Sequence, residues 1–150
     1  MTSSNLWSVV FLVFAGQGIF LSIILFTHKS AVKKANRFLA VLLFLFSLNL
    51  IENVGYWTGF LINIPHSMNV TSSFLFLYGP LFYLYVSSRI NTRRKSNFIT
   101  LLHFLPVLAF NLYMLDYYTL SAEIKVFAFS IEESKAVSSP QIYAPAPVWV

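Results

Sequence analysis

The stretch from Leu6 to Phe26, LWSVVFLVFAGQGIFLSIILF, decides the fold class, because it contains 21 consecutive residues without a charged side chain. As an α-helix it would be about 31 Å long, which matches the roughly 30 Å hydrocarbon core of a bilayer. A secretory signal peptide carries positive charge before a shorter apolar stretch, whereas here the positive charges follow the run. We therefore predict that this stretch is a retained membrane span.

The composition of the whole chain agrees with a membrane protein. Of its 150 residues, 57% are hydrophobic and 10% are charged, whereas soluble domains carry about 25% charged residues. The apolar residues form long runs instead of the short periodic segments of a soluble core. The chain has no cysteine, which excludes disulfides and thiolate metal sites. We predict an all-α membrane protein.

Three more apolar runs follow the first, separated by polar, basic or proline-containing residues. Residues 1–120 are therefore predicted to form a transmembrane bundle with four spans, at residues 6–26, 38–62, 70–88 and 98–115. Pro80 lies in the third predicted span and Pro106 in the fourth. Since a proline removes a backbone hydrogen bond and crowds the preceding turn, we expect a helix kink at each.

The positive charges predict the orientation of the spans. Eight of the ten Lys and Arg residues lie in two patches between predicted spans, at Lys29, Lys33, Lys34, Arg37, Arg89, Arg93, Arg94 and Lys95. The positive-inside rule places both patches in the cytoplasm, which puts both termini outside. Aromatic residues of an interfacial belt fall at the predicted outer boundaries, at Trp7, Trp57, Tyr117, Tyr118 and Trp149. Residues 121–150 are predicted to form an extracytoplasmic loop or tail that leads toward a further span.

Glu52 is the one acidic residue inside a predicted span. A carboxylate there is costly unless it is protonated, paired or in contact with water. Measured along the helices, Gln17 and Asn111 lie at a depth similar to that of Glu52, and three other polar residues share its helical face. We hypothesise a polar layer that binds a small ligand or senses protons, formed by Glu52, Gln17, Asn49, Asn53, Tyr56 and Asn111.

A second interpretation of Glu52 stays open at this point. Its carboxyl group would be neutral and would hydrogen-bond Gln17 or Asn111, so that it joins helices without any sensing role.

Enzymatic, cofactor and metal chemistry have no recognisable pattern in the sequence, and none is predicted. The three histidines, His28, His66 and His103, have no metal-ligand spacing. Contact with the lipid bilayer, not with nucleic acid, is the predicted role of the basic patches. No internal repeat or heptad is apparent. The tripeptide Asn69-Val70-Thr71 fits the glycosylation pattern but lies against a predicted span.

Four short motifs carry a resemblance to a known family. They are Gly16-Gln17-Gly18 in the first span, KANRFLA at residues 34–40, YGPLFYLY at residues 78–85 and HFLP at residues 103–106. In order and spacing, residues 6–118 resemble the amino-terminal membrane region of bacterial membrane-bound AraC-type transcriptional regulators. An N-out start delivers a terminal domain to the cytoplasm only after an odd number of spans, and the resemblance implies about seven. It also implies a helix-turn-helix domain, which these residues do not contain.

The first function hypothesis is therefore a membrane sensor or signal-input module of a transcriptional regulator in the bacterial inner membrane. The chain would be the amino-terminal part of a longer protein, would respond to a small-molecule ligand or to the membrane, would pair as a homodimer, and would not itself bind nucleic acid. Two alternatives stay open. One is a small four-helix proton-coupled transporter, and the other is a non-catalytic membrane anchor.

Overall fold

The computed structural model describes residues 2–29, 33–90 and 102–138, and within them every regular element is helical. Three stretches are long and apolar enough to cross a membrane: Leu6–Thr27, Lys33–Trp57 and Pro65–Ile90. They correspond to helix α1 (Thr2–Thr27), helix α2 (Lys33–Trp57) and helix α3 (Leu75–Ile90) with the short helices before it. The chain is a helical membrane protein.

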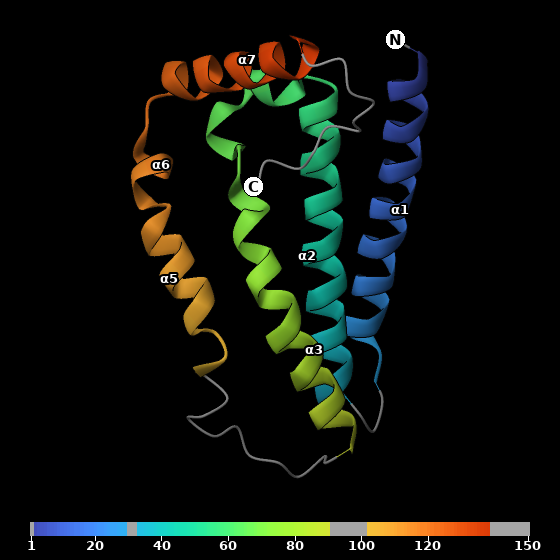
Figure 1. The fold of residues 1–150 in the computed structure, drawn as a ribbon. Coiled ribbons are helices and arrows are strands. Elements are labelled where there is room, and N and C mark those ends of the chain that lie inside the picture. The colour runs from blue at the N-terminus through green and yellow to red at the C-terminus, as the bar shows by residue number, and fades with distance from the viewer. Residues whose placement is uncertain (1, 30–32, 91–101, 139–150) are drawn as a thin grey trace.

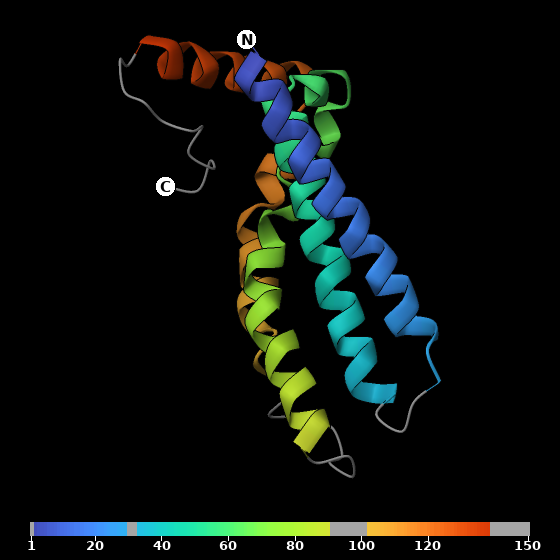
Figure 2. The same cartoon turned by 90° about the vertical axis from the view of Figure 1, so that its right-hand side faces the viewer.

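Helices that follow one another in the chain, α1, α2 and α3, are antiparallel to each other in the bundle (Figures 1 and 2). Helix α2 packs against α1 on one side and against α3 on the other. The first residues of α2 and the last residues of α3 lie at the same end of the bundle. This arrangement brings the described parts of the two basic patches, including Arg37 and Arg89, to one end.

Small buried residues form the contact between α1 and α2. They recur every seven residues along each helix, at Ser8, Ala15 and Ser22 in α1 and at Ala40, Ser47 and Val54 in α2. The Ser22 hydroxyl donates a hydrogen bond of 2.8 Å to the carbonyl of Ala40. The expectation that the chain has no heptad is therefore wrong. Apolar residues fill almost every position of these spans, so that the small residues, and not hydrophobicity, carry the repeat.

Helix α2 is shorter than predicted, because it ends at Trp57 and not at Ile62. Gly59 has a φ of 70°, a left-handed conformation that terminates helices and that glycine adopts without strain. Two 3-10 helices follow, η1 (Phe60–Asn63) and η2 (Pro65–Ser67). The polypeptide thus turns at the end of the bundle over a longer stretch than the sequence suggests.

The third span begins as a 3-10 helix, η3 (Val70–Phe74), and continues as α3. The structure places Pro80 inside α3, where its nitrogen cannot donate to the carbonyl of Phe76. Pro106 is near the start of the described part of the fourth predicted span. It lies in the first turn of α5 (Leu105–Tyr113), where the missing N–H of a proline is tolerated.

The fourth predicted span is described only from residue 102 onward, and its residues 98–101 lie outside the described part. Helix α5 and the short helix α6 (Leu115–Thr119) are separated at Met114 and run alongside α3 (Figure 1). Two ring contacts join residues 103 and 110 of this segment to α3. Phe76 meets Phe110 at 4.9 Å between ring centroids, and Tyr83 stacks on His103 at 5.2 Å.

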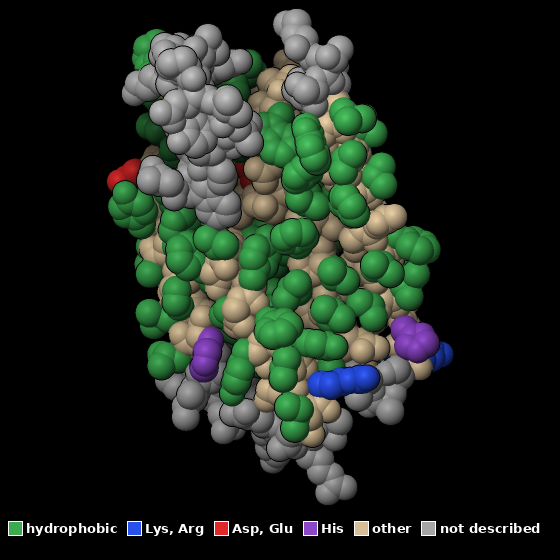
Figure 3. Space-filling view, turned by 45° about the vertical axis from the view of Figure 1, so that its right-hand side comes forward, with side chains coloured by type: hydrophobic (Ala, Val, Ile, Leu, Met, Phe, Trp, Pro, Cys, Tyr) green, Lys and Arg blue, Asp and Glu red, His purple; other side chains and the backbone are tan. Residues whose placement is uncertain are grey.

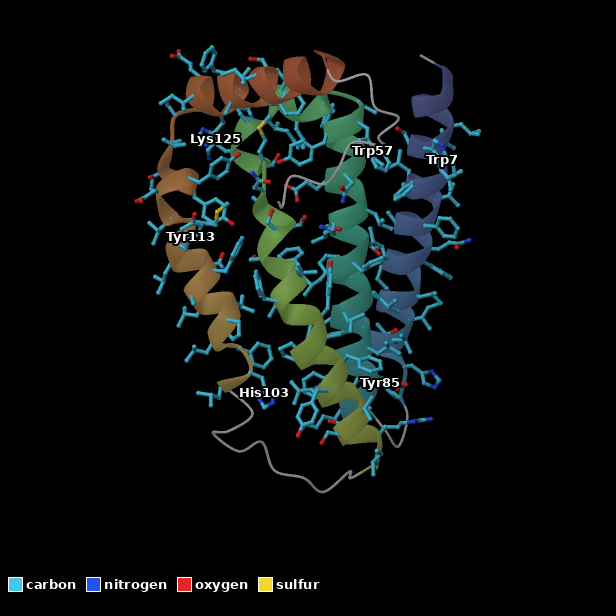
Figure 4. All side chains as sticks on the ribbon, viewed as in Figure 1. Trp7, Trp57, Tyr85, His103, Tyr113 and Lys125 are labelled. Atoms are coloured by element: carbon cyan, nitrogen blue, oxygen red, sulfur yellow. The ribbon has the colours of Figure 1, made fainter. Side chains whose placement is uncertain are left out.

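Residues predicted as a loop or tail form helix α7 (Ala122–Ser138). It lies across the end of the bundle, at the same end as the beginning of α1 (Figures 1 and 2). Trp7 and Trp57 lie at that end too, and the Trp57 ring contacts Phe11 at 4.7 Å (Figure 4). Residues 139–150, including Trp149, lie outside the described residues.

The surface of the bundle agrees with a lipid environment. Large apolar side chains are exposed along the spans, among them Phe14 at 59% and Phe82 at 58%. In Figure 3 such side chains cover the middle of the visible face, the Lys and Arg side chains in view gather toward one end, and the acidic ones lie nearer the other. Lipid tails satisfy this apolar surface, whereas water would not.

The close approach of α1 to α2 predicts a difference between two neighbouring glycines. A Cβ atom at Gly18 would collide with Ser47 Oγ, whereas one at Gly16 meets nothing within 4 Å. We expect Gly18→Val to lower the free energy of unfolding by about 1–3 kcal/mol, because overpacking forces the helices apart. Gly16→Val, which makes the same change of helix propensity, is the control. Thermal or SDS-induced unfolding of the purified protein measures both, and equal losses would contradict the interface.

Candidate functional site

Glu52 lies on α2 with 9% of its surface exposed, and its carboxylate faces the beginning of the third span. The backbone N–H of Val70 donates to Oε1 at 3.1 Å, and that of Thr71 donates to Oε2 at 2.9 Å. The Thr71 hydroxyl donates to the same Oε2. Both carboxylate oxygens therefore have partners inside the protein.

These bonds satisfy backbone N–H groups at the start of the 3-10 helix η3. The first N–H groups of a helix have no partner within the helix, and in hydrocarbon no water replaces one. Asn69 precedes η3 with a φ of 61° and makes no side-chain capping bond. Glu52 supplies the cap from another helix instead, and its negative charge is favourably placed at a helix amino terminus.

Two asparagines extend the site along α2. The Asn49 amide donates to the Thr71 hydroxyl oxygen at 2.9 Å. One turn away, the Asn53 amide donates to the side-chain oxygen of Asn49 at 3.2 Å and to its backbone carbonyl at 2.8 Å. Thr71 thus bridges Asn49 and Glu52.

Tyr56 makes hydrogen bonds with Asn69, the residue that precedes η3. Its hydroxyl accepts from the backbone N–H of Asn69 at 2.9 Å and donates to the side-chain oxygen of Asn69 at 3.2 Å. We call this cluster the polar junction, comprising Asn49, Glu52, Asn53, Tyr56, Asn69, Val70 and Thr71. It connects three successive turns of α2 to the first residues of the third span.

The polar junction continues into α6 and α7. The Tyr118 hydroxyl donates to the carbonyl of Asn69 at 3.3 Å. Burial, followed by the negative charge of Glu52, raises the pKa of Tyr118. Lys125 is 2% exposed, and its ammonium donates to the carbonyl of Tyr118 at 3.1 Å and lies 5.2 Å from the Tyr117 ring centroid (Figure 4). One path of contacts therefore runs from Glu52 to Lys125.

Two residues of the predicted layer lie apart from the polar junction. Gln17 is exposed on α1, and Asn111 donates at 2.8 Å to the carbonyl of Val107 in its own helix. The partners expected for Glu52 were therefore wrong, since Thr71 and Val70 take their place. Depth along a helix axis is only one coordinate, and the rotation of each helix about its axis decides which side chains meet.

The sequence reasoning missed Asn69, Thr71, Tyr118 and Lys125. One signal was present, because Asn, Ser and Thr are common at helix amino termini and 69–73 reads NVTSS. No comparable sequence signal marks Lys125, whose burial depends on how α7 folds over the bundle.

In the junction, backbone and side-chain donors of residues 70 and 71 hold the carboxylate of Glu52 in place. Among the described residues no group of three or more His, Cys, Asp or Glu side chains is arranged to hold a metal ion. His103 lies away from the junction, near the other end of the bundle (Figure 4). No protein-family model, curated protein or solved structure matches the chain.

The bridging position of Thr71 predicts a sharp contrast between two substitutions. Thr71→Val keeps the shape of the side chain but leaves Glu52 with one donor fewer and the Asn49 amide without its acceptor. We expect it to reduce the free energy of unfolding in detergent by about 1–3 kcal/mol. Thr71→Ser keeps the hydroxyl and is expected to stay within about 1 kcal/mol of the wild type. If both variants unfolded alike, the hydroxyl would have no role in the junction.

Proposed function

We propose that this chain is the signal-input module of a membrane-bound transcriptional regulator. The observation that carries the proposal is the polar junction, in which a buried carboxylate caps the start of a span. A purely structural bundle does not need a charged group there, since an intramembrane ionisable residue is costly to keep. The family resemblance of residues 6–118 supports the same function.

In this proposal, the junction relays a change from one end of the bundle to the other. Lys125 and Tyr118 connect it to α7 and α6, and α3 leads away from it toward Arg89 at the basic end. A ligand or a proton that weakens the bonds to Glu52 frees the N–H groups of the first turn. The start of the third span then shifts, and α3 carries the shift along its length.

Such a shift of α3 would change its packing against α5 and the turn before it. One aromatic pair, Phe76 with Phe110, joins α3 to α5, and a second, Tyr83 with His103, joins α3 to the turn before α5. Aromatic pairs of this kind slide and repack at small energetic cost, each pair contributing about 0.5–1.5 kcal/mol. We infer that the signal alters the packing of α3 against α5 and is passed on from there to an effector.

The transporter and anchor alternatives receive less support. A carrier must release its proton or ion from the acid in each cycle, whereas both oxygens of Glu52 are held by the backbone of residues 70 and 71. An anchor requires no charged residue within the spans.

The proposal includes a topology: four spans in the bacterial inner membrane, with the amino terminus outside. The exposed leucines of α5 support a fourth span, at Leu105, Leu108 and Leu112. The gathering of Arg37 and Arg89 at one end supports a cytoplasmic position for that end.

Single cysteines test the topology cleanly, because the chain has no cysteine of its own. In intact cells, a membrane-impermeant maleimide is expected to label Ser3→Cys and Ser121→Cys. Ser30→Cys and Ser96→Cys are expected to react only after the cells are opened. The reverse pattern would overturn the orientation, and a shielded Ser121→Cys beside a labelled Ser3→Cys would overturn the fourth span.

Glu52→Gln, introduced at the native chromosomal locus, tests the function. The new amide group faces a backbone N–H with a donor of its own, so one bond of the cap is lost. A loss of about 1.5 kcal/mol from one packing state changes the ratio of two states roughly tenfold. We expect altered transcript levels of a defined gene set, measured by RNA sequencing, with normal abundance of the protein in the membrane.

Asn111→Leu is the matched control, because it removes a polar side chain of similar depth that bonds only within α5. It is expected to leave transcript levels unchanged. Unchanged transcript levels for Glu52→Gln at normal membrane abundance would contradict the proposal.

A further inference from the structure

Gln17 is a polar residue whose side chain is exposed within an apolar span. It lies on α1, and its side chain is exposed on the face opposite to the small residues that contact α2, such as Ala15 and Ser22. Its side-chain amide makes no hydrogen bond with any residue that the structure describes. The amide therefore points away from the protein into the surrounding lipid.

The depth of Gln17 makes this exposure costly. It lies about 17 Å from Leu6 and about 15 Å from Thr27 along the helix, close to the middle of the span. A glutamine side chain is too short to reach either interface from there. An amide that finds no partner in hydrocarbon costs several kcal/mol, so a polar partner is expected to cover it.

Gln17 is also the centre of a regular seam on α1. The seam residues are separated by four and three positions in alternation, and they are Leu6, Val10, Val13, Gln17, Phe20 and Ile24. This is the a/d spacing of a left-handed coiled coil. Val13, Phe20 and Ile24 are 55%, 65% and 42% exposed. Gly16, beside Gln17, has open space where a side chain would project.

We propose that a second copy of this chain packs on the seam, with the two α1 helices parallel and the two Gln17 amides hydrogen-bonded to each other. A second copy fits because a two-fold axis along the membrane normal places the same residue of both copies at the same depth. An amide carries both a donor and an acceptor, so the pair is self-complementary. A single polar residue in an apolar seam also sets the register and the number of helices.

This dimer does not depend on the proposed function. The contact residues of the seam lie on α1, and the polar junction lies on the opposite side of α2. A sensor, a transporter or an anchor would each satisfy the Gln17 amide in the same way.

Cysteine crosslinking in native membranes tests the seam along its length. Val13→Cys, Phe20→Cys and Ile24→Cys are expected to give crosslinked dimers on mild oxidation. Ile23→Cys is the control, because Ile23 is 57% exposed but lies off the seam. Equal crosslinking at Phe20→Cys and Ile23→Cys would overturn the proposal, and so would the absence of dimers at every seam position or crosslinks to another protein only.

The role of Gln17 is tested in the Phe20→Cys background. Gln17→Leu removes the amide pair from an exposed position, and we expect the dimer to weaken about tenfold, measured as crosslinked fraction against protein-to-lipid ratio. Gln17→Asn keeps an amide and is expected to retain most of the dimer. Circular dichroism confirms that each variant is folded. A Gln17→Leu variant that dimerises like the parent would rule out the amide pair as the contact.

Discussion

A hydrocarbon solvent offers no hydrogen bonds, and this constraint shapes the structure at its most costly point. After α2 ends at Trp57, the chain passes through three short 3-10 helices before α3 begins. The N–H groups at the start of η3 need acceptors, and the carboxylate of Glu52 supplies them. A buried carboxylate and the unpaired N–H groups of a helix start are each costly in a membrane. Glu52 and the first turn of η3 therefore stabilise each other.

Helix α2 contacts its two neighbours by different means. Toward α1 it presents Ala40 and Ser47, whose small size permits the close approach marked by Gly18. Toward the third span it presents Asn49, Glu52 and Tyr56, which hold that span by hydrogen bonds. The contact with α1 depends on the close packing of small residues, whereas the contact with the third span depends on a few directional hydrogen bonds. A signal that acts on the bundle would change the second contact more readily.

The polar junction is also connected to α7, which lies across the end of the bundle. Lys125 is buried there, although a lysine is seldom buried without an acceptor. The carbonyl of Tyr118 and the Tyr117 ring receive its charge, and the Tyr118 hydroxyl reaches Asn69. Segments that are far apart in the chain thus meet around one helix start. The hydrogen bonds of Lys125 and Tyr118 connect α7 to the start of the third span.

The sequence by itself determined the membrane class, three spans and the special status of Glu52, because these depend on local composition and on the cost of a charge in hydrocarbon. The face shared by Asn49 and Glu52 likewise followed from helical periodicity. Only the tertiary structure decided that Glu52 meets Thr71 and not Gln17 or Asn111, and that Lys125 is buried. Those outcomes depend on how each helix is rotated about its axis and on where Gly59 ends α2, and neither is encoded in depth or in hydrophobicity.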